Sequence, residues 1–125
     1  MPILLALALQ LSPAAGADFH ARITQAKLTE GAATGPAYQK QFWDHIGNGT
    51  TDMYKSCIAS NMPADKTPFT LVANILADGR LAQIAVQPET PVARCMAGQF
   101  ASLMVPAPPA QPTPYPIEID FSVTK

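Results

Sequence analysis

Apolar and polar residues alternate most regularly near the end of the chain. Between residues 117 and 123 an apolar residue occupies every second position, and Glu118, Asp120 and Ser122 stand between them. This period of two predicts a strand with one buried and one solvated face. Two further apolar segments, residues 69–76 and 81–86, have strand character and are separated by Asp78 and Gly79. Since this pair tolerates positive φ angles, we expect a hairpin closed by a tight two-residue turn.

Helical spacing appears directly after this hairpin. Thr90 and Pro91 are residue types typical of a helix cap and of a first helical position. An apolar stripe with helical spacing follows them. It consists of Val92, Cys95, Met96, Phe100 and Leu103. Residues 106–116 then contain six prolines, which exclude a regular ladder, so we interpret this segment as an ordered connection to the last strand.

Helices are also predicted before the hairpin. Tyr38, Phe42 and Ile46 are spaced four residues apart after Pro36, and this spacing predicts a short helix. We expect it to end at residues 47–49, two glycines and an asparagine, and a second helix to run from about residue 50 to residue 60. Residues 19–29 have moderate helical character.

Together these elements predict the α+β class. The expected fold is a small three-stranded antiparallel sheet, made of the hairpin and the C-terminal strand and packed by two helices. With 125 residues the chain has room for one such domain. We place the domain at residues 51–125 and a helical N-terminal extension at residues 18–50.

The first 17 residues have the pattern of a signal peptide. Residues 3–11 are apolar apart from Gln10, and the small residues Ala15, Gly16 and Ala17 follow. The apolar run is less than half of the roughly 20 residues needed to span a bilayer. We therefore expect cleavage after Ala17, a mature chain without a membrane span, and a periplasmic or secreted location. A buried or amphipathic N-terminal helix is the alternative.

The chain has two cysteines, Cys57 and Cys95. An even number of cysteines in an exported chain favours a disulfide, and two thiols without further paired ligands cannot complete a tetrahedral zinc site. We therefore expect a bridge and no metal. Two buried free thiols are the alternative.

Charge and motifs indicate no catalytic or nucleic-acid function. The net charge is −1 and the pI about 6.0, so the chain lacks the basic surface typical of nucleic-acid binding. Asp44 and His45 are neighbours in sequence, and on a helix their side chains would diverge. Neither a paired-carboxylate arrangement, nor a glycine elbow at Ser56, nor a phosphate-binding glycine motif occurs. We expect no enzyme and no cofactor.

Several short motifs occur in the order found in one known superfamily. They are Tyr54-x-x-Cys57, Asp78-Gly79-Arg80, Cys95, the proline-rich passage from Val105 to Pro109, and Tyr115-Pro116-Ile117. In this respect residues 51–125 resemble the C-terminal domains of TonB energy transducers, and most of all their two-cysteine relatives of the AgmX/PglI type. In TonB-like domains the sheet takes up a receptor peptide as an added strand. The resemblance implies a similar peptide-docking role in the cell envelope.

The last strand is the candidate binding site. If it lies at a sheet edge, its free backbone groups offer a template for an extended peptide. The residues of this predicted edge are Ile117, Glu118, Ile119, Asp120 and Phe121. Glu118 and Asp120 would discourage self-association and favour peptides with Lys or Arg, although they could also be simple solvating charges.

A second candidate surface comprises Tyr38 and Trp43, whose alternative role is in the core or in a lid over it. From these observations we expect an exported, non-enzymatic protein-binding or peptide-binding module. The alternative is a periplasmic inhibitor or immunity-type protein that blocks an enzyme. A small-molecule carrier is a weaker third interpretation, because so short a chain leaves little volume for both a core and a pocket.

Overall fold

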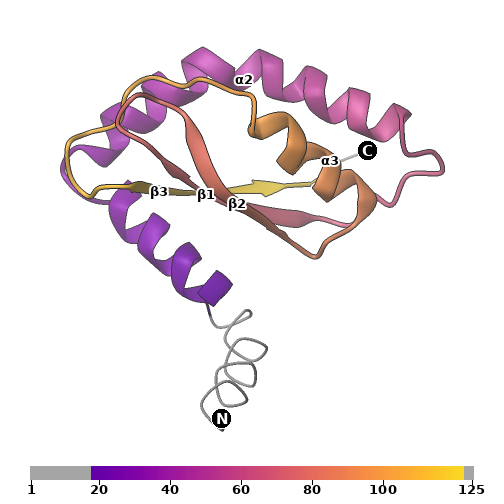
Figure 1. Cartoon of the computed structure of the whole chain (residues 1–125), viewed down its shortest axis with the longest axis horizontal. Helices are drawn as coiled ribbons and strands as arrows, with labels where there is room; N and C mark the ends of the chain where they lie inside the picture. The colour runs from indigo at the N-terminus through magenta and orange to yellow at the C-terminus, as the bar shows by residue number, and fades with distance from the viewer. Residues whose placement is uncertain (1–17, 123–125) are drawn as a thin grey trace, which may run out of the picture.

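The computed structural model describes residues 18–122, so the expected signal peptide lies outside the described part of the chain. The fold is α+β, with a three-stranded antiparallel sheet in the order β2-β1-β3 and helices on both of its faces (Figure 1). The named elements are α2 (Gly35–Ala59), β1 (Phe69–Ile75), β2 (Leu81–Gln87), α3 (Pro91–Phe100) and β3 (Tyr115–Phe121). This confirms the predicted fold class.

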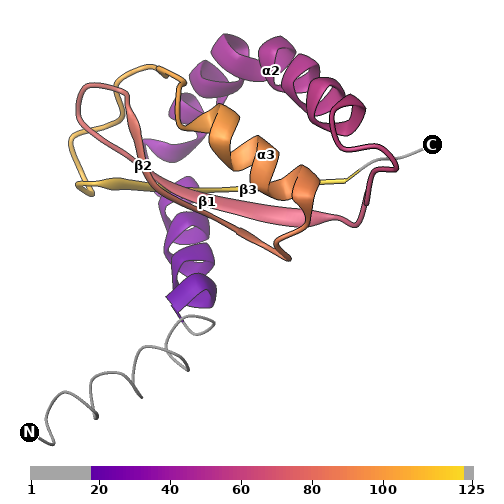
Figure 2. The same cartoon turned by 45° about the vertical axis from the view of Figure 1, so that its right-hand side comes forward.

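Helices α2 and α3 cover one face of the sheet, called here the core face (Figures 1 and 2). Alternate residues of β1 and β3 point into this core, as their sequence period requires. The core residues of these two strands are Phe69, Leu71, Ala73, Ile75, Tyr115, Ile117, Ile119 and Phe121. The expected cap of α3 is also present, since the Thr90 hydroxyl accepts a hydrogen bond from the Ala93 N–H at 3.1 Å.

Helix α2 is continuous, so the expected interruption at residues 47–49 is wrong. Its 25 residues include Gly47 and Gly49, each of which costs roughly 1 kcal/mol relative to alanine inside a helix. Buried side chains on both sides of these glycines hold the helix against the sheet. They are Tyr38, Phe42, Ile46, Thr50 and Cys57. Packing therefore outweighs local propensity, and the expected domain boundary between residues 50 and 51 falls inside α2.

The hairpin between β1 and β2 has a three-residue loop, where the sequence led us to expect two residues. The Leu76 N–H donates to the Arg80 carbonyl at 2.8 Å, which leaves Ala77, Asp78 and Gly79 as the loop. Gly79 has φ +94°, and a Cβ atom there would collide with the Val105 carbonyl oxygen. The glycine is therefore required both by its backbone angle and by the segment that passes over it.

Strand β3 begins two residues earlier than expected, at Tyr115, and includes Pro116. The proline-rich connection before it is anchored to α2. The Tyr38 hydroxyl donates to the Pro106 carbonyl at 2.6 Å, and His45 Nε2 lies 3.1 Å from the Met104 carbonyl oxygen. These contacts agree with an ordered connection rather than a free spacer.

The opposite face of the sheet, called here the far face, is covered by the helix that spans residues 18–30 (Figures 1 and 2). Phe19 and Ala26 of this helix are buried, and Val72 of β1 is fully buried on the same face. Residues 18–30 therefore contribute a second apolar layer, which makes the central strand β1 inaccessible from both sides.

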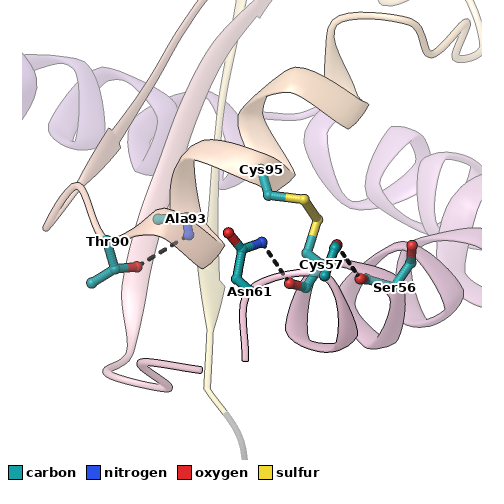
Figure 3. Close-up of a disulfide and its surroundings, with 7 residues drawn as sticks. Ser56, Cys57, Asn61, Thr90, Ala93 and Cys95 are labelled. Carbon is teal, nitrogen blue, oxygen red and sulfur yellow. Dashed lines mark hydrogen bonds between the residues drawn. A yellow bond between two sulfur atoms is a disulfide. The ribbon is translucent and has the colours of Figure 1, made fainter. Parts of the chain in front are cut away.

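A disulfide joins Cys57 near the end of α2 to Cys95 in α3, with a Cα–Cα distance of 5.7 Å (Figure 3). This confirms the predicted pairing. Cys57 is completely buried, and its carbonyl accepts a hydrogen bond from the Asn61 amide at 2.8 Å. The bridge thus holds the two helices of the core face together.

Removing the bridge is expected to destabilise the fold substantially. The cysteines are 38 residues apart, and closing a loop of this length stabilises by about 3–4 kcal/mol in the chain-entropy model. Chemical denaturation of the Cys57→Ala/Cys95→Ala variant should show a loss of that size. Reductant should destabilise the wild-type chain and leave the variant unchanged. A double variant as stable as the oxidised chain would contradict this account.

Phe100 gives a test of the core itself. It is fully buried, and its ring meets that of Phe121 edge-on at 6.1 Å between centroids. Phe100→Ala should lower the free energy of unfolding by about 3–5 kcal/mol, the usual effect of such a cavity. The matched control is Gln99→Ala at the neighbouring exposed position, which should change stability little. Equal melting temperatures for the two variants would show that this helix face is not the core.

Candidate functional site

Strand β3 lies at one edge of the sheet, and its outer side has no strand neighbour among residues 18–122. It pairs with β1 over seven consecutive residues, from Tyr115 opposite Ile75 to Phe121 opposite Phe69. The predicted edge residues, Ile117 to Phe121, all lie within this strand. The structure thus places the five predicted residues together at a free edge.

The direction of the backbone groups follows from the hairpin. In an antiparallel ladder, successive residues send their N–H and C=O groups alternately to the two neighbouring strands. The Leu76 N–H donates to the Arg80 carbonyl, so the backbone N–H and C=O groups of the even-numbered residues of β1 point toward β2. Those of the odd-numbered residues point toward β3. The register then turns the backbone groups of Pro116, Glu118 and Asp120 away from the sheet. Pro116 fits here because the N–H that it lacks would point outward.

The two edges of the sheet differ in regularity. On the β2 side the register shifts between Val72 and Asn74, so that Gln83 and Ile84 both lie opposite Ala73 in a β-bulge. Gln83 has φ +52°, an uncommon angle for a residue with a side chain. Bulges interrupt the pattern that a further strand would have to match. Strand β3, with its unbroken register, is therefore the better template.

Glu118 and Asp120 differ in environment, although both were expected on a solvated face. Asp120 is exposed, and its carboxylate accepts a hydrogen bond from the Thr70 hydroxyl at 2.7 Å. The side chain of Glu118 is only 8% exposed, and one of its oxygens lies 3.4 Å from Lys27 Nζ. The solvated interpretation is therefore wrong for Glu118, because the helix of residues 18–30 covers it.

Glu30 adds a second carboxyl group to this covered position. Its pKa is raised to about 7, first by burial and then by the nearby Glu118 carboxylate, whose effect exceeds the lowering by Lys27. The other oxygen of Glu118, Oε1, is buried without a hydrogen-bond partner among the described residues. A protonated Glu30 can donate to Glu118, whereas two ionised carboxylates would repel each other. Ionisation of Glu30 would therefore oppose its position beside Glu118.

Tyr38 and Trp43 do not form a common surface. Tyr38 is buried, its ring meets that of Tyr115 edge-on at 5.1 Å, and burial raises its pKa to about 12. Trp43 is 38% exposed, and its ring N–H donates to the Gln39 side chain at 3.3 Å. The alternative role of Tyr38 in the core is the one that the structure supports.

Within residues 18–122, no cluster of three or more His, Cys, Asp or Glu side chains could hold a metal ion. None of the helices in this part of the chain is both long and apolar enough to span a membrane. The feature that sequence reasoning missed is the bulge at Gln83, whereas the helix of residues 18–30 agrees with the moderate helical character expected for residues 19–29. The sequence signal for this helix is weak. Phe19, Ile23 and Ala26 are spaced as one helical face, but alanine is too small to mark that face clearly as apolar.

The Glu30 carboxyl should make stability depend on pH. A carboxyl whose pKa is raised on folding contributes stability that is fully present below its unfolded pKa of about 4.5 and is lost as pH rises through about 7. Stability should therefore fall between these values and level off above. In Glu30→Gln the amide can donate to Glu118 at every pH, so the decline should shrink. Urea denaturation at a series of pH values measures the free energy of unfolding of both proteins.

The control for this experiment is Glu89→Gln, the same change at an exposed side chain away from the helix. It should keep the wild-type pH profile. If Glu30→Gln and Glu89→Gln gave the same profile, the Glu30–Glu118 contact would not be the source of the pH dependence.

Comparisons with known proteins leave the family of this chain open. No family model, no curated protein and no solved structure matches it. The TonB-like resemblance accordingly stays a prediction that depends on the order of short motifs.

Proposed function

We propose that this protein is an exported, non-enzymatic binding module that takes up an extended peptide as a fourth strand beside β3. The observation that carries the proposal is the regular free edge of β3, where the backbone groups of Glu118 and Asp120 face outward. Main-chain hydrogen bonds to such an edge supply affinity that depends little on peptide sequence. The partner would be a protein or peptide of the cell envelope, as the TonB-like resemblance implies.

The compartment in this proposal is supported by the Cys57–Cys95 bridge. Disulfides persist in the periplasm and outside the cell, and they are rare in the reducing cytosol. The signal-peptide pattern of the first 17 residues supports the same location. We therefore place the binding reaction in the periplasm or at the cell exterior.

Charge at the edge suggests which peptides are favoured. Glu118 is already paired with Lys27, so Asp120 is the edge carboxylate that an incoming side chain can reach. We expect a preference for peptides with Lys or Arg near this position. The preference should be modest and should weaken with salt, because exposed ion pairs contribute only about 0–1 kcal/mol.

The inhibitor alternative has less support. It would be favoured by a covered β3 together with an exposed patch of Tyr38 and Trp43. Tyr38 is buried and β3 has a free side among the described residues, so we do not pursue a second function.

The proposal predicts that Asp120→Pro weakens peptide binding strongly while the domain stays folded. The Asp120 N–H faces outward, so proline removes a docking group without breaking a bond to β1, and its ring obstructs the incoming strand. The probe is a peptide selected from a random phage-displayed library on the purified full chain. The affinity for this peptide should fall about tenfold or more, because one lost hydrogen bond of roughly 1 kcal/mol lowers it about fivefold and the obstruction by the proline ring adds to that loss.

The matched control is Asp120→Ala, which removes the carboxylate and the Thr70 contact but keeps the N–H. It should bind the selected peptide within a few-fold of wild type. Circular dichroism and a melting curve establish that both variants are folded. If folded Asp120→Pro binds as well as Asp120→Ala, docking at this edge is ruled out.

A further inference from the structure

A cavity of about 680 Å³ opens on the far face of the sheet. It lies between the helix of residues 18–30, the bulged part of the sheet and the end of the proline-rich connection, all of which contribute lining residues. Its volume is within the range of small-molecule sites, roughly 300–1,000 Å³. Neither the core packing nor peptide uptake at β3 uses this space.

The floor of the cavity is made by the bulge in β2. In a regular strand, consecutive side chains point to opposite faces, so Gln83 and Ile84 would be separated. Gln83 and Ile84 are both among the lining residues, at the point where the bulge and the left-handed backbone of Gln83 interrupt this alternation, and Ile84 also packs against the core cluster. The Asn74 amide donates to the Gln83 side-chain oxygen at 2.6 Å, which orients that side chain. A strained backbone that is held in this way is a recurrent feature of binding sites.

Arg22 supplies the positive charge of the cavity. Its Nη2 donates to the Gln83 carbonyl at 2.6 Å, the only hydrogen bond of this guanidinium to the described residues. No salt bridge to Arg22 is present in residues 18–122. The remaining N–H groups of a guanidinium form a planar fork that matches a carboxylate. The half-buried position strengthens such a contact relative to one in open water.

The other walls are mostly apolar. The rings of Pro112, Pro114 and Pro116 provide a rigid apolar surface for a hydrocarbon or aromatic group. Asp18 also lines the cavity, one helical turn before Arg22. Its negative charge disfavours ligands with several anionic groups, such as phosphates. It would accept an ammonium group beside a carboxylate.

From this arrangement we propose that the far-face cavity binds a small monocarboxylate with an apolar body, held by Arg22 and the Gln83 amide. Two sources share this chemistry: an apolar amino acid, whose ammonium would face Asp18, and a simple carboxylic acid without that group. The proposal does not rest on peptide binding at β3, because the two sites share no charged group and have only Pro116 in common.

Three probes of similar size separate the required groups: hydrocinnamate, its uncharged amide, and the amino acid phenylalanine. They are titrated into the purified full chain up to about 10 mM, beyond the millimolar range of weak specific ligands. Amide NMR spectra should show saturable shifts at residues around Gln83 and Arg22 with hydrocinnamate or phenylalanine. The uncharged amide should bind at least about tenfold more weakly, because it cannot pair with the guanidinium.

Arg22→Gln should weaken carboxylate binding about tenfold or more, and Arg22→Lys should restore part of it by returning the charge without the planar fork. The matched control is Arg94→Gln, since Arg94 is exposed and also donates to a backbone carbonyl, that of Glu89. If the Arg22 variants do not fold, Gln83→Gly provides a second test of the same site. Glycine accepts the left-handed backbone, so this variant should stay folded and bind more weakly.

The relative affinities of phenylalanine and hydrocinnamate show whether the ligand is an amino acid or a simple carboxylic acid. Tighter binding of phenylalanine indicates an amino acid with a contact to Asp18, and tighter binding of hydrocinnamate indicates a carboxylic acid. Either order supports a carboxylate site. Absence of saturable shifts with both acids, or equal binding of hydrocinnamate and its uncharged amide, would overturn the proposal.

Discussion

The whole fold depends on the burial of β1 from all sides. This strand pairs with β2 on one side and β3 on the other, and three consecutive residues, Leu71, Val72 and Ala73, are at most 1% exposed. Consecutive side chains point to opposite faces, so their joint burial requires a cover on each face. Helices α2 and α3 supply one cover and residues 18–30 supply the other (Figure 2). Neither layer alone would keep β1 out of water.

The two covers are attached by different means. On the core face, a disulfide and a continuous apolar layer hold α2 and α3, and neither contact depends on exposed charges. On the far face, the helix is attached through a smaller apolar contact and through charged groups, among them Lys27, Glu30 and Glu118. Contacts that depend on protonation and salt weaken first when conditions change. The attachment of the far-face helix is therefore expected to depend more on pH and salt than that of α2 and α3.

The two candidate binding features arise from the two edges of the same sheet. The regular register of β3 leaves a row of outward backbone groups, which suits strand addition. The bulge in β2 disrupts such a row, and its residues Gln83 and Ile84 contribute to the lining of a cavity instead. Regularity at one edge and irregularity at the other thus favour an extended peptide in one place and a compact ligand in the other.

The sequence alone determined the strands, the hairpin position, the cap at Thr90 and the pairing of the only two cysteines, because periodicity, turn residues and composition are local signals. Tertiary structure decided the rest. Packing on the sheet carried α2 through Gly47 and Gly49, and the covering helix buried Glu118 on a face that alternation marked as solvated. Periodicity tells which residues can be buried together, but not which distant segment covers them, since that depends on contacts between residues far apart in the chain.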